Sequence, residues 1–186
     1  MQPASGSFNA ISSDLSGLII VHGGAWNIPS EEENGHCLGM RVALAIGQER
    51  LASGAPAIEI GAAVVASMES DGAFDAGKGA VLMQNGRVEL DAGLMNGESL
   101  QFGAVANIQH FLHPIAIARR ILEVGRRQFS FLAGAGAEVF AEAQGFERMR
   151  NEALICERER VRFERLQWAA NRYHTSDPFP MRPPAQ

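Results

Sequence analysis

Residues 18–25 read LIIVHGGA, and residues 68–82 read MESDGAFDAGKGAVL. Both segments join an apolar run to a cluster of glycines, which marks a place where the backbone turns tightly or where other groups approach it closely. The first run, Leu18–His22, is short and ends at glycines, so it predicts a buried strand. The second segment reads as a connection from a helix to a strand. Taken alone, each is explained equally well as an ordinary turn or loop.

The overall composition is that of a globular protein. The chain has 186 residues, of which 46% are hydrophobic, enough for one folded unit with a core. Its net charge of -5 is made of mixed signs, so it offers neither a basic stripe for nucleic acid nor a polybasic patch for a membrane. The first 17 residues lack the cationic start and apolar run of a signal peptide, and no apolar run is long enough to span a membrane. We therefore expect a cytoplasmic protein, with Cys37 and Cys156 unpaired.

The pattern of apolar residues predicts alternating helices and strands, which is an α/β (α+β) fold. Apolar spacing, with proline and glycine at the ends, predicts helices at residues 39–51, 58–68, 115–124, 134–143 and 152–172. Residues 58–68 are apolar on nearly all sides, so that helix should lie between other layers. In the last helix, oppositely charged pairs such as Glu157 and Arg160 indicate a solvated face.

Two Asn-Gly pairs predict the strand connections. Asn85-Gly86 separates residues 80–83 from residues 88–92, and Asn96-Gly97 precedes residues 103–108. An Asn-Gly pair between apolar runs favours a tight hairpin, in which both central residues adopt positive φ. The sequence therefore predicts a three-stranded meander.

Other chemistries find little support in the sequence. Gly134-Ala135-Gly136 at a helix start could bind phosphate, but the third glycine of a dinucleotide fingerprint is missing, no clear βαβ unit precedes it, and the chain has no P-loop. His110 and His113 have no third ligand at zinc spacing, so structural or surface roles are favoured. No Gly-x-Ser-x-Gly nucleophile elbow occurs.

The two glycine-rich segments, together with VELDA at residues 88–92, resemble the plant-type (type 2) L-asparaginase and isoaspartyl peptidase family of N-terminal-nucleophile threonine hydrolases. The resemblance covers residues 18–165, the family's first, or alpha, segment. It implies the N-terminal (alpha) part of an αββα four-layer sandwich. The expected organisation is a disordered extension at 1–17, the alpha segment at 18–172 and a disordered proline-rich tail at 173–186.

The resemblance also says where the nucleophile belongs. In this family a threonine opens the second segment after a Gly-Thr bond has cleaved itself, and a Val-Gly-Ala-Val-Ala-like strand follows. Thr175 is the one threonine of this chain, and Ser-Asp-Pro follows it. The resemblance therefore implies that the chain alone is inactive and that its partner is a beta segment carrying the N-terminal threonine. It further implies an (αβ)2 assembly acting on asparagine or a β-aspartyl (isoaspartyl) peptide.

The resemblance assigns supporting roles to residues of this chain. Those expected near the cleavage point and nucleophile are His22, Gly23, Gly24 and Asp75. No organic cofactor is implied, but the family's loop binds a sodium ion through backbone carbonyls, whose dipoles suit a hard monovalent cation. The matching residues are Met68, Glu69, Asp71, Phe74, Ala76 and Lys78. The family's substrate-binding residues lie in its second segment, so none is assigned here.

Two positions depart from the family pattern. Asp75 stands where the family usually has asparagine, and an ionised carboxylate cannot donate a hydrogen bond to the nucleophile region. Its charge would also favour a protonated N-terminal amine, which cannot act as a base. Asn96 replaces the aspartate of a Met-Asp-Gly turn. These changes keep open a non-catalytic relative that serves as a scaffold or binding protein, and an unrelated α/β small-molecule binder is a further alternative.

Overall fold

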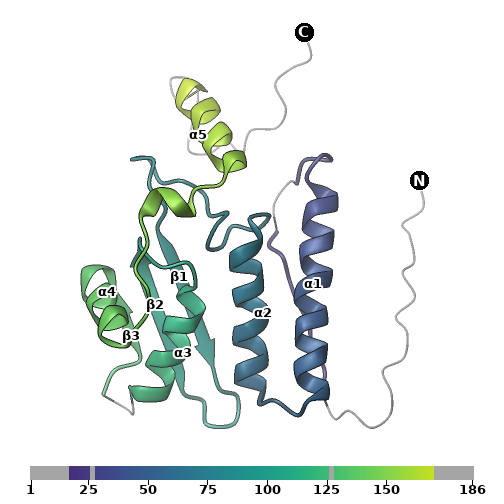
Figure 1. The fold of residues 1–186 in the computed structure, drawn as a ribbon, viewed down its shortest axis with the longest axis vertical. Coiled ribbons are helices and arrows are strands. Elements are labelled where there is room, and N and C mark those ends of the chain that lie inside the picture. The colour runs from purple at the N-terminus through teal and green to yellow at the C-terminus, as the bar shows by residue number, and fades with distance from the viewer. Residues whose placement is uncertain (1–16, 26–27, 126–127, 170–186) are drawn as a thin grey trace, which may run out of the picture.

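The computed structural model describes residues 17–25, 28–125 and 128–169. Figure 1 shows helices packed beside a small sheet, with α5 lying beyond the ends of α2 and of the strands. The elements in chain order are α1 (Glu33–Ala52), α2 (Ala57–Asp71), β1 (Leu90–Met95), β2 (Phe102–Ile108), α3 (Pro114–Val124), β3 (Phe131–Ala133), α4 (Gly134–Ala143), η1 (Asn151–Leu154) and α5 (Glu157–Ala169).

The sheet has the order β1-β2-β3. β1 and β2 are antiparallel, with Met95 opposite Phe102, and β3 runs parallel to β2. The hairpin that Asn96-Gly97 predicts is confirmed, but its loop is longer than a tight turn: the Asn96 amide bonds to the Gln101 carbonyl at 2.8 Å. Within this loop the residue with positive φ is Leu100, at 56°, and the Asn96 side chain accepts the Glu98 amide at 2.9 Å.

The predicted meander is wrong in its first strand. Of residues 80–83, only Leu82 pairs, in a single isolated bridge to Val88, and the third strand of the sheet is β3. The turn between Leu82 and Val88 closes through a hydrogen bond from the Met83 amide to the Arg87 carbonyl at 2.8 Å. Within it Gly86 has a φ of 76° whereas Asn85 does not adopt positive φ. One bridge is too short a ladder to make a strand.

The β2-α3-β3 segment corrects a second expectation. Two parallel strands joined by a helix form a βαβ unit, so such a unit does precede Gly134. It was missed because β3 has only three residues, too few for a periodic signal. The third glycine of a dinucleotide fingerprint is still absent, and this crossover places α4 beside the sheet.

The predicted strand at residues 18–22 is also wrong. No strand forms there, and Leu18 and Ile20 are 76% and 83% exposed. Ile19 packs against the apolar cluster between α1 and α2. A strand requires a neighbouring strand to bond its amides, and the sheet in the described ranges does not reach this segment. That sheet has three strands, so the four-layer sandwich remains a proposal.

The predicted helices fare better. α3 begins at Pro114, and α4 has the expected bounds. The helix predicted at 152–172 is wrong at its start: η1 ends at Leu154 and α5 begins at Glu157, while residues 170–172 lie outside the described residues. At the start of η1, the buried Asn151 side chain donates to the carbonyls of Val88 and Gln109 at 2.8 and 2.7 Å. These bonds hold η1 against the sheet.

Two apolar clusters hold these elements together. The larger lies among the strands, α3 and α4, and includes Val105, Ile108 and Ile117. The smaller joins α1 and α2 through Ala43, Ile60 and Val64. α2 lies between α1 on one side and α3 with β1 on the other, as its all-round apolar sequence predicted. Among the described residues no helix combines the length and apolar character needed to cross a membrane.

Candidate functional site

The site begins at the C-terminal end of α2. Gly72 follows the helix with a φ of 86°, a left-handed conformation that glycine adopts without strain. The Asp71 side chain accepts the Ala73 amide at 3.1 Å, which fixes the first turn of the loop. Residues 72–79, here called the glycine loop, then fold back until the Lys78 amide bonds to the Glu69 carbonyl at 2.8 Å.

Carbonyl oxygens crowd the inside of the glycine loop. A Cβ at Gly77 would lie 2.3 Å from the Glu69 oxygen, and one at Gly79 would lie 2.4 Å from the Phe74 oxygen. A Cβ at Gly72 would lie 3.3 Å from the Lys78 oxygen. No other residue type can take the place of Gly77 and Gly79 without moving the backbone, so the loop's glycines leave room for carbonyl oxygens. Such a cradle of dipoles suits a cation.

Phe74 connects the glycine loop to the other glycine-rich segment. Its ring is 2% exposed, and a Cβ at Gly23 would lie 3.0 Å from its Cε1 while one at Gly39 would lie 2.7 Å from its Cε2. His36 packs edge-on against it at 5.7 Å. The two segments singled out from the sequence therefore meet in space, because glycine at position 23 lets the phenyl ring approach the backbone.

The remaining predicted site residues lie around this contact. His22 is exposed, and its Nδ1 accepts the Gly24 amide at 3.1 Å. Asp75 is exposed, and its Oδ1 accepts the Val81 amide at 2.8 Å. Of the six expected cation-binding carbonyls, those of Glu69, Phe74 and Lys78 crowd the glycine positions. The oxygens of Met68, Asp71 and Ala76 are not among the atoms nearest to these positions.

The Glu69 side chain has a role that the sequence did not predict. It is 2% exposed; Oε1 accepts the Ile115 amide at 3.0 Å, and Oε2 lies 3.1 Å from Nδ1 of His113. Burial raises the pKa of Glu69, although the hydrogen bonds from His113 and from the Ile115 amide oppose this. The carboxylate caps the first turn of α3 and holds α2 to that helix. The sequence does not distinguish this side chain, since α2 also carries the acids Glu59 and Asp71.

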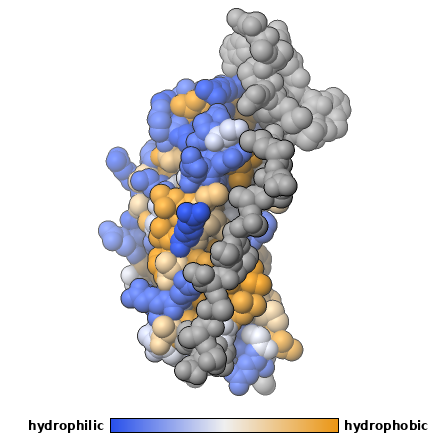
Figure 2. Space-filling model, turned by 90° about the vertical axis from the view of Figure 1, so that its right-hand side faces the viewer, coloured by the Kyte–Doolittle hydropathy of each residue, from blue (hydrophilic) through white to orange (hydrophobic). Residues whose placement is uncertain are grey.

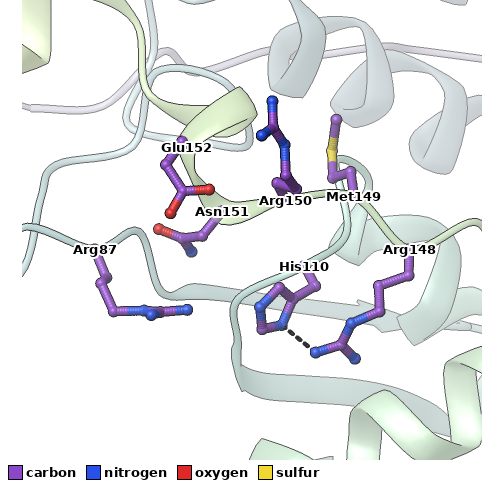
Figure 3. A pocket seen from close by; sticks show the side chains of 7 residues that line it. All are labelled: Arg87, His110, Arg148, Met149, Arg150, Asn151 and Glu152. Carbon is purple, nitrogen blue, oxygen red and sulfur yellow. Dashed lines mark hydrogen bonds between the residues drawn. The ribbon is translucent and has the colours of Figure 1, made fainter.

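A second cluster of polar side chains lines an open pocket of about 370 Å³ (Figure 3). His110 Nδ1 lies 2.8 Å from Oε1 of the buried Glu138 and 2.8 Å from the Arg148 guanidinium. This nitrogen can donate to the carboxylate or accept from Arg148, but cannot do both. The Arg150 side chain points away from His110 in Figure 3, so the cations of this pocket do not converge on one point.

His110 and His113 thus pair with different carboxylates, Glu138 and Glu69. In the part of the chain that the structure describes, no three His, Cys, Asp or Glu side chains are grouped so as to hold a metal ion. Cys37 and Cys156 are unpaired, as expected. Both histidines therefore make carboxylate contacts within the fold, which agrees with a structural role.

Glu138 should make stability depend on pH. Burial raises its pKa, but the Gln109 amide, His110 and Arg148 together lower it further, so the pKa lies below its ordinary value of 4.5. A lowered native pKa stabilises the fold above the unfolded-state pKa, and that stabilisation is lost as pH falls through the native value. We expect Glu138→Gln to lower the free energy of unfolding by about 1–3 kcal/mol at pH 7, and this deficit should shrink below about pH 4.

Denaturant unfolding between pH 7 and pH 3.5 measures this difference. Glu142→Gln is the matched control, since Glu142 pairs with the same Arg148 at 2.8 Å but is exposed, and an exposed pair contributes little. A deficit for Glu138→Gln that stays constant over the whole range would contradict the expected role of its charge.

Comparison with known proteins identifies a family that includes both glycine-rich segments. Residues 16–184 match the asparaginase family. An isoaspartyl peptidase/L-asparaginase of Xenopus laevis is 35% identical over 161 residues, covering 87% of this chain and 50% of that protein. Those of Homo sapiens and Mus musculus are each 36% identical, covering 80% and 82% of this chain and 48% and 46% of their own lengths.

The chain spans about half the length of the curated relatives it matches. Within that half, the match runs through the LIIVHGGA segment, the glycine loop and every described helix and strand. The extent of the family match, rather than any single motif, decides the assignment: this chain belongs to the asparaginase family.

Proposed function

We propose that this chain is the alpha portion of an asparaginase or β-aspartyl (isoaspartyl) peptidase that hydrolyses a side-chain or isopeptide amide. The nucleophile is an N-terminal threonine on a second segment, whose hydroxyl attacks the amide carbonyl while its own amine takes the proton. As the C–N bond breaks, that proton passes to the departing ammonia or amine, which leaves an acyl-enzyme. Water then hydrolyses the acyl-enzyme. The observation that carries the proposal is the packing of Phe74 against Gly23, which joins the two segments that define the family resemblance.

In this proposal the chain's residues position the second segment. Gly23 and Gly24 give the backbone next to the cleavage point the freedom that the strained geometry of autoproteolysis needs; Gly24 has a φ of 101°. The His22 side chain holds that turn through the Gly24 amide. Asp75 lies in the glycine loop with one carboxylate oxygen bound to Val81, and the other can face the nucleophile. We further propose an (αβ)2 assembly in the cytoplasm.

The glycine loop is the proposed sodium site, with carbonyls of Met68, Glu69, Asp71, Phe74, Ala76 and Lys78 as ligands. Three of these oxygens already crowd the loop, which supports the assignment. We expect the complex of this chain with the second segment to have a higher melting temperature in sodium chloride than in choline chloride of equal ionic strength. At a sodium concentration ten times the dissociation constant, binding raises the free energy of unfolding by about 1.4 kcal/mol. Differential scanning calorimetry measures it, and equal melting temperatures in both salts would contradict a sodium site.

Asp75 gives a test of the nucleophile's surroundings. We expect Asp75→Asn to raise kcat of the complemented enzyme several-fold, because an amide can donate a hydrogen bond and carries no charge that keeps the threonine amine protonated. The Val81 amide keeps an oxygen acceptor in this variant. Asp91→Asn is the matched control, since Asp91 is also exposed and also accepts a backbone amide, that of Asn107 at 2.7 Å. An unchanged or lower kcat would place Asp75 away from the nucleophile.

A non-catalytic scaffold is the second candidate, and Asp75 is the observation that favours it. Co-production of residues 1–186 with the second segment of one of the relatives separates the two candidates. We expect a co-purifying complex that hydrolyses L-asparagine or a β-aspartyl dipeptide, and no hydrolysis when the second segment carries Ala in place of its N-terminal threonine. A complex that forms but hydrolyses neither substrate would favour the scaffold.

A further inference from the structure

Arg158, near the start of α5, contacts the glycine loop at two points. Its Nη1 donates to the Ala73 carbonyl at 2.6 Å, and its Nη2 donates to the Gly79 carbonyl at 3.0 Å. These two carbonyls lie at opposite ends of the loop. One guanidinium therefore holds both ends, which its rigid fork of donors allows.

The bonded carbonyls lie next to proposed sodium ligands. The Ala73 carbonyl lies one peptide unit before the Phe74 carbonyl. The Gly79 carbonyl lies one peptide unit after the Lys78 carbonyl. Fixing a peptide plane restricts the dihedral angles through which its neighbour can turn. The Phe74 and Lys78 oxygens both crowd the glycine positions, so their directions depend on the two planes that Arg158 holds.

The guanidinium is itself held in place. Its Nε donates at 2.8 Å to Glu159, which is 1% exposed. Nη1 also lies 3.7 Å from the buried Oε2 of Glu32, at the start of α1. Charge-assisted bonds of this kind are stronger than neutral ones. Arg158 thus ties the loop, α1 and α5 together, although 85 positions separate it from Ala73.

We infer that Arg158 is a positioning residue for the glycine loop, which fixes the loop carbonyls for the cation and couples the docking of α5 to sodium binding. The inference rests on the sodium site proposed above. Because coupling between two binding events is reciprocal, sodium should also strengthen the docking of α5. Arg158 itself touches neither substrate nor nucleophile in this account.

Hydrogen exchange and sodium titration of the chain in complex with the second segment test the inference together. Arg158→Gln should speed deuterium uptake in residues 72–81, and it should raise the sodium concentration needed for half of the thermal stabilisation by about fivefold or more. Arg158→Lys keeps the charge and the apolar stem but loses the fork, so it should show the same changes to a smaller degree. It replaces Arg158→Gln as the test variant if Arg158→Gln does not fold. Arg160→Gln is the matched control: Arg160 lies on the same helix, is exposed and bonds Glu157 and Glu164.

The outcomes separate this inference from the sodium site. Faster exchange and weaker sodium response in the Arg158 variants, with both unchanged in Arg160→Gln, would support it. Unchanged exchange in residues 72–81, or faster exchange with an unchanged sodium response, would overturn it while the sodium site stands. If the unaltered chain itself shows no sodium response, both the site and the inference resting on it fail, whereas amide hydrolysis keeps its own test.

Discussion

Replacing Gly103 by alanine is expected to lower the free energy of unfolding by about 3 kcal/mol or more, a large share of the roughly 5–15 kcal/mol that stabilises a typical domain. Gly103 lies on β2 where α3 crosses the sheet. A Cβ there would lie 2.2 Å from the Ala118 carbonyl oxygen and 2.4 Å from the Leu122 amide nitrogen. Both atoms belong to the backbone of α3, so relief requires the helix to move away from the strand.

The matched control for Gly103→Ala is Gly93→Ala on the neighbouring strand. At Gly93 the nearest atom to a new Cβ is that of Ala104, at an ordinary contact distance of 3.8 Å, so alanine should be neutral or stabilise by about 0.5–1 kcal/mol. Thermal unfolding measures both variants. The melting temperature should fall by about 10 °C for Gly103→Ala, and a fall no larger than that of Gly93→Ala would contradict the close packing of β2 on α3.

Residues 1–186 made without a second segment are expected to self-associate and to bind a dye that reports apolar surface. α2 is not the source of this surface, because α1, α3 and β1 pack against it. The exposed apolar side chains lie elsewhere, and they include Leu18, Ile20, Leu38, Val42, Met95, Phe102 and Phe131. Figure 2 shows apolar residues gathered over the middle of the face on which α1 lies.

Covering several hundred Å² of such surface contributes several kcal/mol at about 25 cal/mol per Å², so a partner that does so should suppress both effects. The double variant Leu18→Ser, Ile20→Ser should bind less dye. Met83→Ser is the control, because Met83 is 46% exposed but stands in the turn before Gly86. Light scattering and dye fluorescence measure the effects. A monomer that binds no dye and unfolds in one cooperative step would contradict them.

The local parts of the fold could be predicted from the sequence. Pro114 placed the start of α3, and Gly145 limited α4, because both residues act through their own backbone geometry. The strands predicted at residues 18–22 and 80–83 do not form, because a strand depends on a partner that lies far away in the sequence. β3 is too short for a periodic pattern, so the parallel βαβ unit could not be seen.

The candidate site was predictable in its backbone and not in its side chains. Glycines at positions 72, 77 and 79 carry a sequence signal because only glycine tolerates the carbonyl oxygens around them. The side chains of Arg158 and Glu69 carry none: a charged residue in a charged helix, or an acid near the end of an apolar helix, usually faces solvent. Their contacts with the loop and with α3 follow from tertiary packing alone.

The central claim is that a threonine on a second segment, and no residue of this chain, attacks the amide. Intact-mass spectrometry of the complemented complex after incubation with an electrophilic asparagine analogue tests it most directly. We expect one covalent adduct, on the second segment, that disappears when its N-terminal threonine is replaced by Ala, while residues 1–186 keep their unmodified mass. An adduct on residues 1–186, or hydrolysis by this chain alone that survives Thr175→Ala, would contradict the claim.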